Sequence, residues 1–353
     1  MILNRVRYQG FRNLVDAEID FSDDFNYIIG DNGAGKTNLL EAVYYAGNGS
    51  SFREKEDRSL IRFNAEFLRV EAEAGSDRIA AVYLDAARKK ITLDGNNVPR
   101  ISDFIGWLGV TIMSIDDIWI VRGAPARRRH FLDWAIAKIS PAYVAALVEY
   151  RKIVRQRNRF LQSLNENGSR KLFEVFDEQL ITSGNEIYRR RAAKLPELRE
   201  IFSGIGAHFS LRKLDMNYKT ECSDMELNEQ ILRRVRSVEI ARGQTVVGPH
   251  RDDLLFSLNG HSMQHYASEG EERAASISLK LAEAEMLYRA RGERPILLLD
   301  EVSAELDATK RDILLGLLQG QVLFASTRAL ESDTIAGRKI RVFHIERGKV
   351  EIS

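Results

Sequence analysis

The chain has 353 residues, of which 44% are hydrophobic and 29% charged, a composition that excludes wholly disordered, collagen-like and disulfide-stapled folds. Basic and acidic residues number 52 and 51, so any nucleic-acid surface must come from local clusters of charge. The single cysteine, Cys222, fits a reducing compartment, and the sequence has neither a signal-type N-terminus nor an apolar run of about 18 residues. We therefore expect a soluble, cytoplasmic protein of about two domains.

Short alternating apolar runs in residues 2–29 predict β-strands separated by polar turns. A helix is expected after Gly35, because apolar residues from Leu39 to Tyr44 recur at spacings of three and four. Alternation returns in residues 67–93 and ends at the turn signal of residues 94–97.

The pattern becomes helical over residues 131–164 and 172–202, with a loop expected at 165–170 and an interruption of the second helix at Pro196. Strand-like runs resume at 245–258. A helix is then expected at 271–291, and strands at 296–299 and 322–325. The prediction is an α/β body that carries a helical insertion, so the two ends of the sequence must meet in space.

A phosphate-binding loop is predicted between the strand that ends at Ile29 and the following helix. Its motif, G-x-x-x-x-G-K-[ST], consists of Gly30, Asp31, Asn32, Gly33, Ala34, Gly35, Lys36 and Thr37. Glycines let the backbone wrap a phosphate, and the helix N-terminus adds a favourable dipole. Lys36 is expected to reach the β and γ phosphates, and the Thr37 hydroxyl to hold Mg²⁺. A chance glycine turn is the alternative, which the strand–loop–helix context disfavours.

Two carboxylates follow the apolar strand of residues 296–299. Asp300 is expected to reach the magnesium ion beside the loop, as a Walker B acid does, and Glu301 to act as the general base on the attacking water. The alternative is a core strand that ends in an acidic turn. Arg12 and Asn13, beside the first strand, and Asn38, after the loop, are further candidate nucleotide contacts, although Arg12 could equally be an ordinary surface residue.

A second phosphate-binding corner is predicted at Ser268 and Gly270, which open the helix before this strand. One nucleotide does not need two such corners on one chain. Two chains arranged head to tail, each supplying Ser268 and Gly270 to the other's nucleotide, would use both. Taken alone, the pattern is that of an ordinary helix cap.

In order and spacing, these motifs resemble the RecF family of bacterial recombination-mediator ATPases, an ABC-type group with the SMC and Rad50 proteins. The matching segments run nearly from end to end: GFRNL (10–14), LLEA (39–42), RGAP (122–125), RRRHFLD (127–133), VGPHRDDL (247–254) and AEAE (282–285). No long coiled-coil pattern occurs, unlike in SMC or Rad50 proteins.

The resemblance implies an ABC-type ATPase head in three sequence parts: residues 1–125 and 241–353 form the ATPase lobe, and 126–240 a mainly helical lobe. It implies weak DNA-stimulated hydrolysis of ATP with Mg²⁺, and Ser303 and Asp307 fall in the segment called the D-loop. It also implies an ATP-dependent homodimer on gapped or junction DNA, double- and single-stranded. With RecO and RecR, such a dimer helps RecA to load in gap repair, replication and the SOS response.

The chain departs from the family pattern at the signature. Family signatures resemble S-Q-G-Q-Q-R, whereas this chain has Glu269, Glu271 and Glu272 in place of the glutamines. We expect these carboxylates to face solvent or arginines, which leaves Ser268 and Gly270 as contacts. Segment 114–117 keeps an acid in the Q-loop region, and Ser326-Thr327 stand where transporters have a switch histidine, so hydrolysis should rest mainly on Glu301.

Clusters of arginine give the sequence its candidate DNA-binding surface. Arg151, Arg155 and Arg159 recur every four residues, so they share one helix face. Arg127 and Arg128 precede the helical region. Such groups suit phosphate contacts that position DNA without reading its sequence. Solvated helix faces paired with nearby acids are the alternative reading of each cluster.

Other function classes fit less well. A transporter's ATPase subunit would need a membrane partner and a switch histidine. A DNA-end nuclease would need more chain after Asp300. An ATP-binding DNA clamp without hydrolysis remains an alternative. His250, Asp252 and Asp253 are too crowded on one short segment to surround a metal ion, so a structural role is expected there.

Overall fold

The computed structural model describes residues 1–353 except 77, 164–169, 329–334 and 336. The chain divides into two compact units. Unit 1 comprises residues 1–118, 205–211 and 268–353, and unit 2 comprises residues 119–204 and 212–267. Each unit is built from segments that are distant in sequence.

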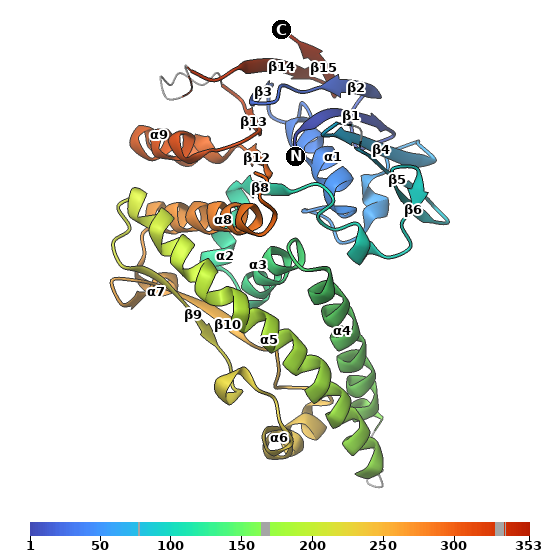
Figure 1. Ribbon diagram of the computed structural model, residues 1–353, viewed down its shortest axis with the longest axis vertical. Helices are drawn as coiled ribbons and strands as arrows, with labels where there is room; N and C mark the ends of the chain where they lie inside the picture. Colours follow the sequence, from blue (N-terminus) through green and yellow to red (C-terminus); the bar gives the residue numbers. More distant parts are fainter. Residues whose placement is uncertain (77, 164–169, 329–334, 336) are drawn as a thin grey trace. The chain divides into compact units, whose positions relative to one another are not determined.

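Unit 1 contains two six-stranded sheets (Figure 1). The order of the first is β15-β14-β3-β13-β12-β8, with parallel pairing from β14 to β8 and an antiparallel edge strand β15. Its strands are β3 (Phe25–Ile29), β8 (Val110–Ser114), β12 (Ile296–Asp300), β13 (Val322–Ser326), β14 (Ile340–Glu346) and β15 (Lys349–Ile352). The central strands are continuous apolar runs because both faces of the sheet are buried.

The second sheet of unit 1 is antiparallel, in the order β2-β1-β4-β5-β6-β7. Its strands are β1 (Leu3–Gln9), β2 (Ala17–Asp20), β4 (Phe67–Ala74), β5 (Arg78–Asp85), β6 (Lys89–Leu93) and β7 (Asn96–Asn97). Burial alternates along β4 and β5, as expected for a sheet with one face on the core.

Helix α1 (Lys36–Asn48) contacts β4 and β5 of the antiparallel sheet as well as β8, β12 and β13 of the parallel one. Its side chains are buried from Leu39 to Asn48, and it ends at Gly49, whose φ of 65° suits a glycine C-cap. Helices α8 (Glu269–Arg291) and α9 (Ala308–Leu317) and the 3₁₀ helices Asp57–Leu60, Ile101–Asp103, Ile115–Asp117 and Val302–Glu305 complete this unit.

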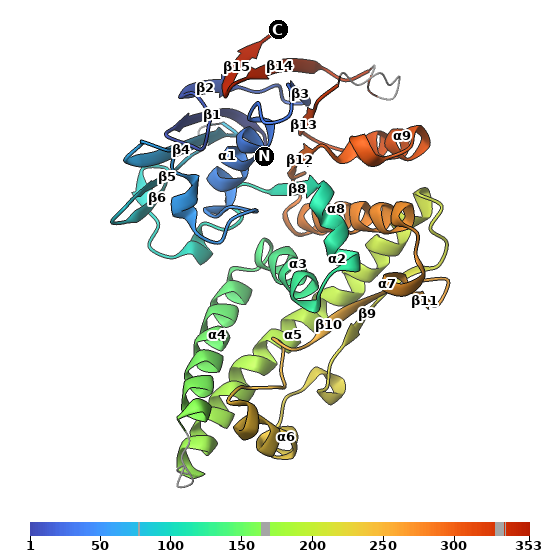
Figure 2. The ribbon, with the colours of Figure 1, turned by 180° about the vertical axis from the view of Figure 1, so that it is seen from behind.

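Unit 2 is mainly helical (Figure 2). It contains α3 (Pro125–Ala137), α4 (Pro141–Gln162), most of α5 (Arg170–His208), α6 (Glu229–Arg242), α7 (Met263–Tyr266) and the 3₁₀ helix Ser223–Met225, and α2 (Ile118–Arg122) leads into it. Its sheet has the order β11-β10-β9, with β9 (Leu214–Lys219), β10 (Asp253–Leu258) and β11 (His261–Ser262).

The expected α/β body with a helical insertion is confirmed, but some boundaries differ. The C-terminal part of unit 1 begins at Ser268 instead of residue 241, because β10 pairs with β9 and so belongs with the helices. Unit 2 also begins earlier, at residue 119 instead of 126. Of the strand expected at 245–258, only residues 253–258 are extended in a sheet.

The predicted interruption at Pro196 is wrong, because α5 continues through this residue to His208. A proline removes one backbone hydrogen bond, and buried Tyr188, Leu198 and Phe202 anchor the helix on both sides of it. The loop expected at 165–170 falls on residues outside the described part, except for Arg170, which begins α5.

Candidate nucleotide-binding site

The loop of residues 30–37 joins β3 to α1, as predicted, and its backbone requires glycine. Gly33 and Gly35 have φ angles of 80° and 120°, a region that other residues rarely adopt. At Gly30, an added Cβ would lie 2.3 Å from the carbonyl oxygen of Ile345. Within the described chain, the N–H groups of Gly33 and Gly35 donate to no acceptor. Unpaired donors at a helix N-terminus are what an anionic phosphate binds.

Lys36 is held over this loop. Its side chain is 5% exposed, and its ammonium donates to the carbonyl oxygens of Gly30, at 2.7 Å, and Asp31, at 3.0 Å. It also lies 3.0 Å from Oε1 of Glu301, an ion pair without hydrogen-bond geometry, since this oxygen has no hydrogen-bond partner. A buried ammonium needs such compensation. The anionic oxygens of a nucleotide can compensate the same charge.

Asp300, at the end of β12, lies beside the first turn of α1. The Thr37 hydroxyl is 2.9 and 2.8 Å from its two carboxylate oxygens. Burial raises the pKa of Asp300; the bond from Thr37 opposes this, and the charge of Glu301 adds to it. A divalent cation would relieve the cost of this buried carboxylate.

The oxygens of Thr37 and Asp300 fit Mg²⁺, which prefers hard oxygen ligands and takes few of them from a protein. In the described residues, no group of three His, Cys, Asp or Glu side chains could hold a metal. Two protein oxygens leave room for the nucleotide oxygens and waters that Mg²⁺ also takes.

Glu301 has a left-handed backbone, with a φ of 57°. This conformation costs a non-glycine residue of order 1–3 kcal/mol, and such strain clusters at functional sites. Here the N–H of Glu301 donates to the Ala325 oxygen on β13 at 3.1 Å, and the side chain is 21% exposed. The position next to Asp300 and Lys36 suits a base that acts on water beside the γ-phosphate.

In the described residues, no hydrogen bond or ion pair joins the Arg12 side chain to the loop. Its guanidinium makes two hydrogen bonds, of 2.8 and 3.0 Å, to the fully buried carboxylate of Glu41. The loop is instead contacted by Asn13, whose amide donates to the Gly33 oxygen at 3.2 Å. Asn13, which the sequence also indicated, thus supports the loop, and the contact of Arg12 with a nucleotide stays a prediction.

Asn38 joins this support, because its amide donates to Asn13 at 2.7 Å. Arg53 donates to Asn38 at 3.1 Å, and nothing in the sequence pattern had indicated this arginine. Its position in the loop after α1, outside any motif, explains why.

The signature corner opens α8. Ser268 is the N-cap: its N–H and its hydroxyl donate to the carboxylate of Glu271, at 2.7 and 2.8 Å, and its hydroxyl accepts from the Glu271 N–H. Glu269 pairs with Arg273, as expected of an acid that turns to an arginine. Glu272 is buried, so it does not face solvent.

The D-loop segment lies against this corner. Arg273 forms an ion pair with Glu305, and a Cβ added at Gly270 would lie 3.3 Å from the ammonium of Lys310. Lys310 in turn bonds to Asp307, the N-cap of α9. Ser303 is buried. In the described residues, no hydrogen bond or ion pair joins Ser268 to residues 30–37.

The candidate DNA-binding arginines separate into two kinds. Arg127 and the three arginines of α4, Arg151, Arg155 and Arg159, are exposed. Arg128 is 3% exposed and makes two hydrogen bonds to Asp253, at 2.7 and 2.8 Å, so it is unavailable to a ligand.

The segment around His250 is structural in its contacts. The His250 ring shares a hydrogen bond of 2.6 Å with Tyr150, and burial lowers its pKa to about 4. Asp252 accepts from Tyr218 at 2.6 Å, and Asp253 is held by Arg128. These partners explain the segment without a metal.

No helix in the described part of the chain is both long and apolar enough to cross a membrane.

The parallel sheet, the phosphate loop and the two carboxylates at the end of β12, those of Asp300 and Glu301, define an ABC-type ATPase head of the SMC class. The SMC head of Pyrococcus furiosus is similar in fold, with a TM-score of 0.54 at 16% identity. The family model for the RecF/RecN/SMC N terminal domain matches residues 2–329.

Similar proteins with curated names show to which family of this class the chain belongs. The chain is 34% identical to the DNA replication and repair protein RecF of Bacillus cytotoxicus, over 99% of this chain and 98% of that one. It is 35% identical to the RecF protein of Oceanobacillus iheyensis, over 94% of each chain. Solved structures of the recombination mediator RecF in its ATPγS and ATP forms match with TM-scores of 0.91 and 0.89 and identities of 31% and 30%. They cover 99% and 100% of this chain and 97% of each of those chains. The chain belongs to the RecF family.

Proposed function

We propose that this chain is an ATP-dependent DNA-binding protein of recombinational repair and replication, which binds ATP with Mg²⁺ at residues 30–38 and Asp300. The observation that carries the proposal is the meeting of Lys36, Thr37, Asp300 and Glu301 in one unit. In this arrangement, Lys36 neutralises the β and γ phosphates, Thr37 and Asp300 hold the cation that supplies further neutralisation, and Glu301 accepts a proton from the attacking water.

ATP binding drives head-to-tail dimerisation in this proposal. In the described residues, no hydrogen bond or ion pair joins Ser268 to the chain's own loop, and we propose that Ser268 and Gly270 bind the nucleotide of a second copy. Slow, DNA-stimulated hydrolysis then separates the two copies. The named RecF relatives and the RecF structures described for the RecFOR pathway support this reading.

DNA is the partner that we propose for unit 2. Arg155 and Arg159 are exposed on α4, and in the described residues neither forms an ion pair. They suit contacts to the phosphates of gapped or junction DNA. We further propose RecR, with RecO, as protein partners that act with this chain to load RecA, and the cytoplasm as its location, as for a DNA-repair protein.

The test is the solution mass of the full chain by light scattering, with ATP·Mg²⁺, with ADP·Mg²⁺ and without nucleotide. We expect a dimer with ATP·Mg²⁺ alone, and its loss in Ser268→Arg. Glu293→Arg, on the exposed turn after α8, is the control and should dimerise like the wild type. A wild-type monomer in all three conditions would contradict dimerisation by ATP alone.

A further inference from the structure

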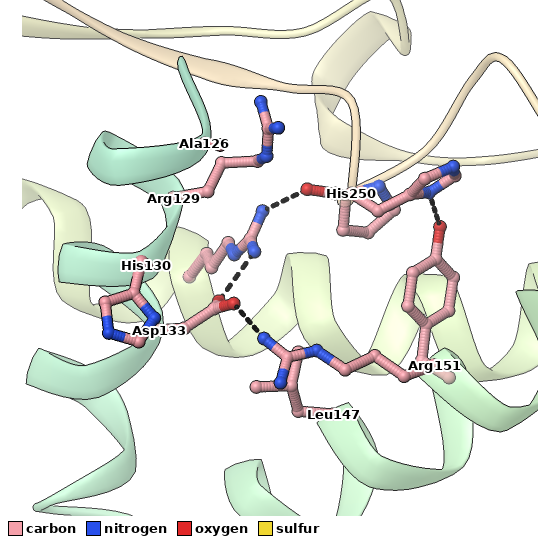
Figure 3. A pocket seen from close by; sticks show the side chains of 10 residues that line it. Ala126, Arg129, His130, Asp133, Leu147, Arg151 and His250 are labelled. Atoms are coloured by element: carbon pink, nitrogen blue, oxygen red, sulfur yellow. Dashed lines mark hydrogen bonds and ion pairs between the residues drawn. The ribbon is translucent and has the colours of Figure 1, made fainter. Parts of the chain in front are cut away.

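A cavity of about 180 Å³ lies within unit 2, lined by residues of α3, α4 and α5 and of the turn before β10 (Figure 3). Its walls carry three guanidinium groups, those of Arg129, Arg151 and Arg191, and one carboxylate, that of Asp133. His250, also in the wall, is neutral near pH 7 because burial lowers its pKa to about 4. The cavity therefore has an excess of positive charge.

Arg191 is a fixed part of this wall. It is 1% exposed and donates to Asp133 at 2.8 Å, to the hydroxyls of Tyr143 and Tyr218 at 3.0 and 2.7 Å, and to the Pro249 oxygen at 2.9 Å. These bonds join α5 to α3, α4 and β9. Asp133 is thus shared between Arg191 and Arg151, and it is the one carboxylate among the described residues that line the cavity, against three guanidinium groups.

Arg129 and Arg151 keep donors for a ligand. In the described residues, Arg129 uses its side chain for one hydrogen bond, to the backbone carbonyl oxygen of Asp252 at 2.8 Å. Arg151 uses its side chain for one, to Asp133 at 3.1 Å, and is 57% exposed. A guanidinium has five N–H donors, so each keeps several. Burial lowers the pKa of Arg129; the charge of Asp253 opposes this, and the charges of Arg191 and Arg251 add to it.

The cavity also continues a basic surface. Arg151 is the first of the exposed arginines of α4, which recur at Arg155 and Arg159. At about 1.5 Å per residue, this row is ~12 Å long. The phosphates of one B-DNA strand follow each other at about 3.4 Å along the helix axis, so the row matches the length of three to four of them. Arg151 is thus shared between the cavity and the row.

We propose that Arg129 and Arg151 bind one phosphate group in this cavity, and that the phosphate belongs to the sugar–phosphate backbone of bound DNA. Guanidinium groups match the oxygens of a phosphate in charge and geometry. The inference rests on the DNA binding proposed above. It adds a contact to DNA from Arg129 on α3, outside the row of arginines on α4. Free phosphate is the other source of the same chemistry.

The first experiment measures the affinity of the full chain, with ATP·Mg²⁺, for a labelled 30-base-pair duplex at several salt concentrations by fluorescence anisotropy. We expect Arg129→Gln with Arg151→Gln to bind on the order of tenfold more weakly and to lower the slope of log affinity against log salt by about 0.9, the share of one phosphate. The single variant Arg151→Lys keeps the positive charge, so it should retain most of the wild-type slope of log affinity against log salt. Arg233→Gln, an exposed arginine of α6, is the control and should not change it.

A second experiment separates the two sources of phosphate. Inorganic phosphate is titrated at constant ionic strength against wild type and the double variant, with ADP·Mg²⁺ filling the nucleotide site, and followed by ³¹P line broadening. If the double variant loses the ³¹P line broadening and still shows the wild-type salt slope for DNA, that result would overturn the assignment to the DNA backbone and assign the cavity to free phosphate. No change in either experiment would overturn the cavity as a phosphate site.

Two further outcomes also decide on the proposed phosphate site. If the wild type binds no DNA at all, the proposed DNA binding fails, the backbone assignment fails with it, and the phosphate titration decides on the cavity alone. If the double variant loses its helical circular dichroism, Arg151→Gln takes its place, because this exposed side chain supports little of the fold. An unchanged slope and unchanged ³¹P broadening in that single variant would remove Arg151 from the site.

Discussion

The Thr37 hydroxyl lies 2.9 and 2.8 Å from the two carboxylate oxygens of Asp300, although the residues are 263 positions apart in the sequence. This contact joins the two segments of unit 1 that the helical insertion separates. It also places a hydroxyl and a carboxylate, both hard oxygen ligands, at the start of α1. The raised pKa of Asp300 follows first from burial, so a bound cation would stabilise its ionised form.

Asp300→Asn should abolish the part of ATP binding that depends on magnesium. The change removes the charge that attracts the cation but keeps an acceptor for Thr37. In thermal unfolding with ATP, we expect magnesium to raise the midpoint of the wild type above that in EDTA, and to leave the variant unaffected. Asp20→Asn, on the antiparallel sheet, should behave as wild type. An intact magnesium effect in Asp300→Asn would remove Asp300 from the metal site.

Glu301→Gln should lower the steady-state rate of ATP hydrolysis by about 10²–10⁴-fold, the usual contribution of general base catalysis. ATP affinity should persist, because the phosphate-facing groups of Lys36 and the loop remain. The measurements are phosphate release and nucleotide binding on the same preparation, with Glu293→Gln as the control. Turnover close to the wild-type rate would mean that Glu301 is not the base. No turnover in the wild type itself would favour the DNA clamp.

The contiguous motifs are the part of the site that the sequence predicts well. A strand, eight loop residues and a helix fix the place of Lys36 and Thr37 through local geometry alone, and an apolar strand that ends in Asp300 must emerge at the carboxyl edge of a parallel sheet. The meeting of Thr37 with Asp300 is predicted from the pairing of a phosphate loop with a Walker B motif, since no local rule pairs strands so distant in sequence.

The contacts made by isolated side chains could not be predicted in this way. Arg128 and Arg127 are neighbours in one basic run, yet one is buried against Asp253 and the other exposed. The difference depends on the helix face that α3 turns to β10, which is settled by packing between segments over a hundred residues apart. Arg12 similarly has its partner in Glu41, on α1.

Glu271→Gln should strengthen ATP-dependent dimerisation. In the structure, the Glu271 carboxylate binds both the N–H and the hydroxyl of Ser268, which are groups that an incoming γ-phosphate needs. A neutral amide can still cap the helix but repels the phosphate less, so the dimer dissociation constant should fall several-fold. Light scattering over a range of protein concentrations measures this constant. Glu269→Gln, whose native carboxylate faces Arg273, is the matched control, and an equal effect in both would contradict a specific role for Glu271.

His250 should make the stability of unit 2 depend on pH. Its pKa is lowered to about 4, so the folded state disfavours the protonated ring, first because of burial and then because of Arg251, Arg129 and Arg157. The stabilisation is complete above the unfolded pKa of about 6.5 and is lost as the pH falls towards 4. Its upper limit is about 3 kcal/mol, reduced by solvent screening.

Urea unfolding at pH 7.5, 5.5 and 4.5 measures this dependence. The difference in unfolding free energy between wild type and His250→Asn isolates the histidine from the carboxylates that titrate in the same range. We expect this difference to shrink as the pH falls, because the wild type alone loses the contribution of the neutral ring. A difference that is constant with pH would show that His250 keeps its ordinary pKa.

Arg155→Glu with Arg159→Glu should weaken DNA binding and flatten its salt dependence, whereas Arg128→Gln should do neither. The two exposed arginines of α4 would each neutralise one phosphate, so their loss should lower the slope of log affinity against log salt by about 1.8. Arg128 is buried against Asp253. Removing it leaves that carboxylate unpaired, which should cost about 3–5 kcal/mol of unfolding free energy. Duplex titrations at several salt concentrations, with urea unfolding of the same variants, separate the two effects, and an unchanged slope in the double variant would exclude this face of α4 from DNA binding.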